Sequence, residues 1–257
     1  MRRILIACLL ASFAVSVSAQ DLPFHGKWKL NPARSDFRGL SFTVAAGKAP
    51  GELTFSQYGQ SYTFKVDGKD YPATMGTTAR WRQIDPNTWE AVISMKGQPL
   101  TTLTMAMESD GRRMILKGRG KRPDGQEHNE DVVFQRVAAR RDLVGKWTST
   151  KADITTPVTL ALTANGADGV TYAIPEFGMT CKLKFDGSDQ RCTGPAEAPG
   201  HTLSAVRAGK AALRITEKMN GKTLIVSTLS PSPDGKTLTE FGKTADGEAF
   251  KAVYEKQ

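Results

Sequence analysis

Few residues in this chain could bind a metal ion or transfer protons, and they lie far apart. The three histidines are His25, His128 and His201, and no two of them have the i, i+4 spacing that places two ligands on one helix face. A metal site needs three or four converging ligands. The sequence also lacks a Gly-x-Ser-x-Gly elbow, a glycine-rich phosphate loop and a His-Glu-x-x-His motif. We therefore expect a protein that is not an enzyme and that has no metal and no cofactor.

Two cysteines are spaced for a disulfide. Cys181 lies five residues before the dipeptide Asp186-Gly187, and Cys192 lies five residues after it. Asp-Gly is typical of a two-residue hairpin turn, which sets such residues directly opposite each other on neighbouring strands. Cross-strand partners lie about 4.5 to 5.5 Å apart at Cα, a separation that a disulfide can span. The alternative, a reactive thiol pair, finds no Cys-x-x-Cys motif to support it.

A set of large apolar side chains in the first half of the chain could line a binding cavity. Methionine adapts to irregular shapes, and tryptophan or tyrosine combines an apolar body with a polar tip. Such a lining would suit an apolar or aromatic small molecule. The alternative is a packed core with no cavity, as small barrels often have. The candidate ligand-binding residues are Tyr62, Phe64, Tyr71, Trp81, Trp89, Leu103, Met105 and Met107.

Alternation of apolar and polar residues indicates that these side chains lie on strands. Tyr62, Phe64 and Val66 are separated by polar residues, and similar short runs recur along the whole chain. A period of two gives one buried and one wet face. Asp-Gly and Asn-Gly pairs between the runs are hairpin signals. The pattern predicts an all-β fold of two consecutive antiparallel up-and-down barrels with about eight to ten strands each.

The division into two units comes from an internal repeat at an offset of 119 residues. Such a repeat constrains the fold more strongly than a single motif does. It predicts one barrel over residues 20–138 and a second over 139–257. A single outer-membrane barrel built from both copies is disfavoured, because lysine, arginine and aspartate are frequent in the strands. The repeated residues are Gly26, Lys27, Trp28, Lys65, Asp67, Gly68 and Asp70, matched by Gly145, Lys146, Trp147, Lys184, Asp186, Gly187 and Asp189.

The first residues have the features of a secretory signal peptide. Two arginines precede an apolar run, and small residues lead to Ala19, after which we expect cleavage. The run is too short to span a membrane, which takes about 20 apolar residues. A periplasmic or secreted protein without a membrane span follows. The formal net charge of +9 includes Arg2 and Arg3 of the signal peptide, and the remaining +7 is spread evenly over both copies, so no basic patch predicts a nucleic-acid partner.

The opening of each copy resembles the Gly-x-Trp signature of lipocalin-type barrels. Gly26-Lys27-Trp28 starts the first copy and Gly145-Lys146-Trp147 starts the second, and the string from Asp85 to Glu90 is also similar to small exported lipocalin-like proteins of bacteria. The resemblance implies a small-molecule cavity and gives Trp28 and Trp147 a structural role across the closed barrel ends. It also implies that a cation near the end of the last strand packs on the tryptophan of its own copy, as Arg136 would in the first copy.

Three functions remain open from the sequence. The first is an exported, non-catalytic carrier that binds a small hydrophobic ligand in the first copy, where the interior aromatic residues concentrate. The second is a structural or protein-interaction module of the cell envelope with filled barrels and no ligand. The third is an enzyme whose catalytic groups converge from distant strands. The carrier is the interpretation that we favour.

Overall fold

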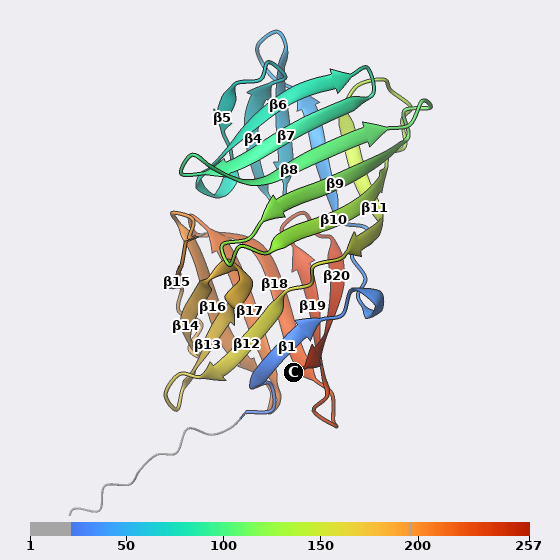
Figure 1. The fold of residues 1–257 in the computed structure, drawn as a ribbon. Coiled ribbons are helices and arrows are strands. Elements are labelled where there is room, and N and C mark those ends of the chain that lie inside the picture. Colours follow the sequence, from blue (N-terminus) through green and yellow to red (C-terminus); the bar gives the residue numbers. More distant parts are fainter. Residues whose placement is uncertain (1–21, 196) are drawn as a thin grey trace, which may run out of the picture.

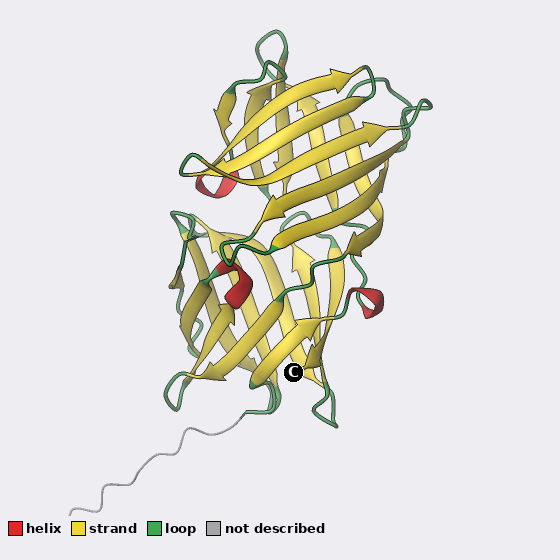
Figure 2. Ribbon diagram, viewed as in Figure 1, coloured by secondary structure: helices red, strands yellow, loops and turns green. Residues whose placement is uncertain are grey.

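The computed structural model describes residues 22–195 and 197–257, which form two antiparallel β-sheets with three short 3-10 helices (Figure 2). Each sheet has ten strands; one is a closed barrel and the other is nearly closed. The predicted all-β fold of two antiparallel barrels is confirmed. The predicted signal peptide, residues 1–19, lies outside the described residues. Within the described chain, no helix has the length and apolar character needed to cross a membrane.

The nearly closed sheet, barrel 1, contains β2 to β11, and the closed sheet, barrel 2, contains β1 and β12 to β20 (Figure 1). Barrel 1 is built from β2 (Ser41–Ala46), β3 (Glu52–Gln57), β4 (Gln60–Lys65), β5 (Asp70–Pro72), β6 (Thr77–Asp85), β7 (Thr88–Met95), β8 (Gln98–Met107), β9 (Arg113–Lys121), β10 (Glu127–Gln135) and β11 (Gly145–Ile154). Barrel 2 is built from β1 (Gly26–Leu30), β12 (Thr159–Ala164), β13 (Gly169–Ile174), β14 (Met179–Lys184), β15 (Gln190–Thr193), β16 (His201–Ala208), β17 (Ala212–Met219), β18 (Lys222–Pro231), β19 (Thr237–Thr244) and β20 (Ala249–Lys256). The 3-10 helices are η1 (Pro32–Arg34), η2 (Thr74–Gly76) and η3 (Pro175–Phe177).

The first strand of each sequence repeat lies in the barrel formed by the other repeat. In β1, Trp28 is paired with Leu160 of β12 and with Lys256 of β20, so this strand closes barrel 2. In β11, Trp147 is paired with Phe42 of β2, and the strand also pairs with β10. The chain therefore enters barrel 2, crosses to build barrel 1, and returns along β11 into β12.

This exchange makes the sheets divide the chain differently from the repeat, whose boundary falls between residues 138 and 139. Barrel 1 takes its last strand from beyond that boundary, and barrel 2 takes β1 from the far end of the chain. The physical reason lies in the two strand starts. Both begin with Gly-Lys-Trp, so the same pairing positions and the same indole pocket accept either strand.

The two signature tryptophans close the distant ends of the barrels. Both indole rings are fully buried. The Nε1 atom of Trp28 donates a hydrogen bond to the carbonyl of Phe24 at 2.9 Å, and Nε1 of Trp147 donates to the carbonyl of Leu143 at 2.9 Å. Buried indoles need such a partner for their single polar atom, and here a backbone carbonyl four residues upstream provides it in both barrels.

The exchange also changes the cation that packs on each tryptophan. The Arg136 guanidinium lies 4.3 Å from the ring centroid of Trp147, and Nζ of Lys256 lies 5.3 Å from the ring of Trp28. The expectation that Arg136 packs on the tryptophan of its own copy is therefore wrong, because β11 takes the place of β1 in barrel 1. Arg136 is buried and donates to the backbone carbonyls of Gly111 and Val144, each at 2.7 Å, which satisfies its charge at the closed end.

The barrels differ at one seam of the wall. In barrel 2, β14 pairs with β15, and the predicted Cys181–Cys192 disulfide is confirmed between directly opposed residues with a Cα separation of 4.2 Å. In barrel 1 the corresponding strands, β4 and β5, are the two outer strands of the sheet order and share no ladder. Tyr62 and Ala73 stand at the positions of the two cysteines. One seam is covalently joined and the other is not hydrogen-bonded.

The open ends of the barrels face each other. In the turn between β3 and β4, the amide of Gly59 donates to both carboxylate oxygens of Asp246 in barrel 2 at 3.2 Å. Met75 of η2 packs against Met219 and Leu224 of barrel 2. Figure 1 shows the barrels stacked one above the other, with the residues between β1 and β2 passing from the lower barrel to the upper. Barrel 2 therefore contacts the rim of the mouth of barrel 1.

Candidate functional site

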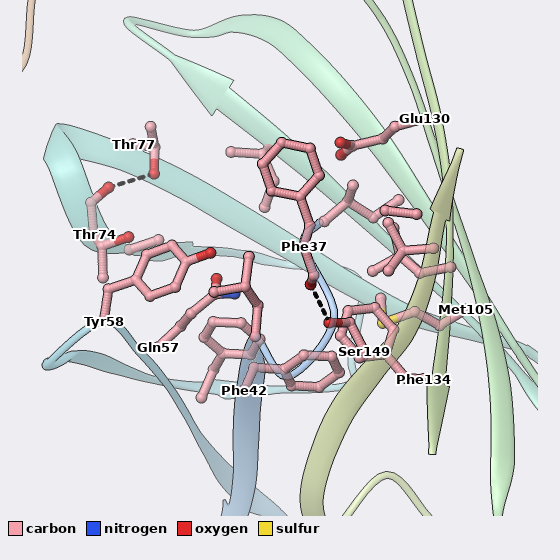
Figure 3. A pocket seen from close by; sticks show the side chains of 18 of the residues that line it. Phe37, Phe42, Gln57, Tyr58, Thr74, Thr77, Met105, Glu130, Phe134 and Ser149 are labelled. Carbon is pink, nitrogen blue, oxygen red and sulfur yellow. Dashed lines mark hydrogen bonds between the residues drawn. The ribbon is translucent and has the colours of Figure 1, made fainter. Parts of the chain in front are cut away.

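An interior cavity, cavity 1, lies inside barrel 1 and has a volume of about 450 Å³. Side chains from most strands of the barrel contribute to it, and most of them are apolar. Figure 3 shows the labelled rings of Phe37, Phe42 and Phe134 around the space, with Met105 and Glu130 at its side. Ligand-binding cavities in proteins are typically about 300 to 1,000 Å³ and largely apolar. The size and lining of cavity 1 fall within that range.

One wall of cavity 1 is a continuous layer of aromatic rings. Phe42 stacks on Phe55 at 5.3 Å between centroids, and Phe55 contacts Tyr62 at 5.4 Å. Phe42 also meets Phe134 edge to face at 5.0 Å. Ring pairs at these separations add to the energy of burial and fix each other's orientation. The wall is therefore a rigid apolar surface, suited to contact with a flat ligand.

The polar groups of cavity 1 lie mainly toward the mouth. The carboxylate of Glu130 lies over Gly118, its ladder partner on β9, where a Cβ atom would come within 2.8 Å of Glu130 Cγ. Burial and the nearby carboxylates, Glu248 foremost, raise the pKa of Tyr58 to about 12. Ser149 donates from Oγ to the carbonyl of Phe37 at 2.6 Å (Figure 3). The polar rim thus holds Phe37 in place and leaves Glu130 facing the cavity.

Four of the eight predicted ligand-binding residues line cavity 1: Tyr62, Trp81, Leu103 and Met105. The Nε1 atom of Trp81 donates to the Tyr62 hydroxyl at 3.2 Å. Burial raises the pKa of Tyr62 to about 12, so the hydroxyl stays neutral. Tyr62 and Trp81 therefore present one joined aromatic surface with its polar atoms already paired to each other.

The other four predicted residues do not line cavity 1. Phe64 is fully buried behind Trp81, with stacked rings 4.4 Å apart. Tyr71 donates its hydroxyl to Asp67 at 2.8 Å at the closed end. Met107 lies beneath Arg136, and Trp89, two residues from the turn at the closed end, is buried in the core. Alternation identifies the inner face of a strand but not the depth along the barrel axis, which decides whether a residue meets the cavity.

Several lining residues were not predicted from the sequence. Phe42 and Phe55 alternate with polar neighbours and could have been found by the same period of two. Ser149, Ala152 and Ile154 belong to β11, which the repeat assigns to the other barrel. Strand exchange gave no signal in the sequence, because both copies begin with the same three residues.

A second, smaller cavity, cavity 2, lies inside barrel 2 and has a volume of about 250 Å³. Phe37, in the segment that crosses between the barrels, lines both cavities. Its ring stacks on that of Phe250 with centroids 6.4 Å apart. Phe37 is therefore a shared wall between the two interior spaces.

No protein-family model matches the chain, and a comparison with curated proteins likewise finds no match. The arguments about function therefore rest on the geometry of the two cavities. In residues 22–257 without residue 196, no group of three or more histidine, cysteine, aspartate or glutamate side chains is placed to hold a metal ion.

Proposed function

We propose that this protein is an exported lipocalin-like carrier that binds a small apolar or aromatic molecule in cavity 1. The observation that carries the proposal is an interior space of about 450 Å³ walled by stacked aromatic rings. Transfer of apolar surface from water into such a space is favourable by roughly 25 cal/mol per Å². The disulfide fits an oxidising compartment outside the cytoplasm, which agrees with the signal peptide expected from the sequence.

The ligand would reach cavity 1 through the seam between β4 and β5. Barrel 2 contacts the rim of the mouth, and the tryptophan end is packed, so we infer entry through the wall. The seam is the position in this sheet where neighbouring strands share no ladder. Local opening costs least where few backbone hydrogen bonds must break. Tyr62 and Ala73, at the seam, both line cavity 1.

The proposal is tested with a neutral fluorescent probe, N-phenyl-1-naphthylamine, whose emission rises in apolar surroundings. The variant Leu116→Glu places a carboxylate among the lining residues, and Lys117→Gln changes the net charge equally at the exposed position next to it on β9. Because an uncompensated buried charge is costly, Leu116→Glu should weaken probe binding at least about tenfold, whereas Lys117→Gln should leave it within about twofold.

Circular dichroism of both variants shows whether the barrel is intact. The proposal is refuted if the unmodified protein does not enhance probe fluorescence. It is also refuted if folded Leu116→Glu binds the probe as tightly as the control variant, because the probe would then lie outside cavity 1.

A further inference from the structure

The two barrels can be compared position by position through their ladders. Arg136 and Lys256 occupy the same place, each over a signature tryptophan. Six residues before them lie Glu130 and Phe250, and the ladder partner of each is a glycine, Gly118 on β9 and Gly242 on β19. Four residues before Arg136 and Lys256 lie Val132 and Ala252. Their ladder partners are Leu116 and Glu240, so these two residues are equivalent. Neighbouring ladders extend the correspondence around both barrels.

At five equivalent lining positions, an apolar residue of cavity 1 is replaced by a polar one in cavity 2, and all ten residues line their respective cavities. Two lining pairs show the opposite change, Glu130 with Phe250 and Ser149 with Leu30. The net result is two carboxyl groups in cavity 2 against one in cavity 1. The five pairs are Phe55 and Tyr172, Ile93 and Glu217, Leu103 and Ser227, Leu116 and Glu240, and Phe134 and Tyr254.

The two carboxyl groups of cavity 2 lack a strong cationic partner. Glu240 accepts a hydrogen bond from the Tyr254 hydroxyl at 2.9 Å and forms no ion pair within the described chain. Glu217 Oε1 lies 2.8 Å from Nε2 of His201, which is charged only when protonated. Burial, together with the nearby Glu217 carboxylate, raises the pKa of Glu240. A cation in the cavity would offset the repulsion between the carboxylates of Glu217 and Glu240.

Aromatic rings complete the cavity. Phe37 and Phe250 stack between the barrels, and the Phe250 ring lies across Gly242, where a Cβ atom would be 2.1 Å from its Cζ. Tyr172 faces the cavity, and its hydroxyl has no hydrogen-bond partner among the described residues. Carboxylates and aromatic faces both attract ammonium groups. The free Tyr172 hydroxyl can also accept a hydrogen bond from such a group.

We propose that cavity 2 is a second binding site and that it takes a small organic amine in its protonated form. The ammonium group would lie between Glu217 and Glu240, and its apolar part would contact Phe37 and Phe250. A volume of about 250 Å³ admits only a small molecule. The site is chemically distinct from cavity 1 and does not depend on the function proposed for that cavity.

Calorimetric titration with phenethylamine tests this inference, with 2-phenylethanol as the neutral analogue of similar shape. Phenethylamine should bind the unmodified protein at least about tenfold more tightly than the alcohol, because the alcohol has no charge for the two carboxylates. Glu240→Gln keeps the side-chain shape and should weaken amine binding at least about tenfold. Glu130→Gln makes the same change in cavity 1 and should leave amine binding within about twofold.

A second variant keeps the test decisive if Glu240→Gln alters the fold. Ser227→Leu restores the residue that barrel 1 has at the equivalent position, and it should abolish amine binding by filling cavity 2 with apolar volume. The inference is overturned if the amine does not bind the unmodified protein, if the alcohol binds equally well, or if folded Glu240→Gln binds the amine as tightly as Glu130→Gln does.

Discussion

Reduction of the Cys181–Cys192 disulfide should destabilise barrel 2 and leave barrel 1 unchanged. Both sulfurs belong to strands of barrel 2, and they join a seam whose ladder contains only two residue pairs. Barrel 1 has no covalent bond at its own seam. Reduction changes no side-chain volume, so it isolates the contribution of the covalent bond better than a substitution of either cysteine would.

The size of the effect follows from the short loop that the disulfide closes. The cysteines are separated by 11 residues. The chain-entropy relation for a closed loop of this length gives about 2.8 kcal/mol at 25 °C. Amide hydrogens that exchange only through unfolding of barrel 2 should then exchange about 100-fold faster, since about 1.4 kcal/mol corresponds to a factor of ten.

Hydrogen exchange measured by mass spectrometry on oxidised and reduced protein makes the test, because it resolves individual strands. The decisive peptides cover the exchanged strands. β1 should exchange faster after reduction together with β12 to β20, although it lies at the other end of the sequence, while β11 should keep its protection together with β2 to β10. Unchanged exchange in β1, or acceleration of β11 with barrel 2, would show that the strands are not exchanged or that the barrels unfold as one unit.

Three further predictions follow from the seam, the crossing strands and cavity 2. A protease site inserted between Ala138 and Ala139 should yield, after cleavage, two fragments that co-elute in size-exclusion chromatography, because each contributes a strand to the other's barrel; separation without denaturant would contradict the exchange. Tyr62→Cys combined with Ala73→Cys should form a disulfide across the seam. Compared with the same variant in reduced form, the oxidised variant should release the naphthylamine probe more slowly and be more stable by about 2.8 kcal/mol. Equal release rates would exclude the seam as the route. The pKa of Glu240 is raised in the folded protein, so its contribution to stability is lost as pH rises from the unfolded-state pKa through the folded-state pKa. Glu240→Gln should therefore gain stability relative to the unmodified protein on going from acidic to neutral pH, as measured by urea unfolding, and parallel pH profiles would contradict the burial of this carboxyl.

The elements of the fold were predictable because local signals specify them. Alternation placed Tyr62 and Phe64 on one strand, β4, which ends one residue before Val66, and the spacing around Asp186-Gly187 set Cys181 opposite Cys192. Both are properties of sequence neighbours. The same spacing around Asp67-Gly68 does not join β4 to β5, although the Gly68 amide donates to the carbonyl of Trp81 just as the Gly187 amide donates to that of Ala205 in barrel 2. A turn signal therefore brought two strands close without pairing them.

The candidate site was only partly predictable because its composition depends on contacts between distant segments. Leu103 and Met105 line cavity 1, whereas Met107, on the same face of the same strand, lies too deep and packs under Arg136. Glu240 was not singled out at all, since a lone glutamate on a strand resembles any solvated residue. Its meaning appears only when the ladders place it opposite Ala252 and equivalent to Leu116 of the other barrel.

The crossing segment makes the two interior spaces physically dependent on each other. Phe37 lines both cavities, and its position is fixed from one side by the Ser149 hydroxyl of the exchanged strand β11 and from the other by the ring of Phe250. Ser149 belongs to the second sequence repeat but to barrel 1, and Phe250 belongs to barrel 2. Any ligand that displaces Phe37 from one cavity must therefore change the volume of the other, so the duplicated barrels hold two chemically different chambers that share one wall residue.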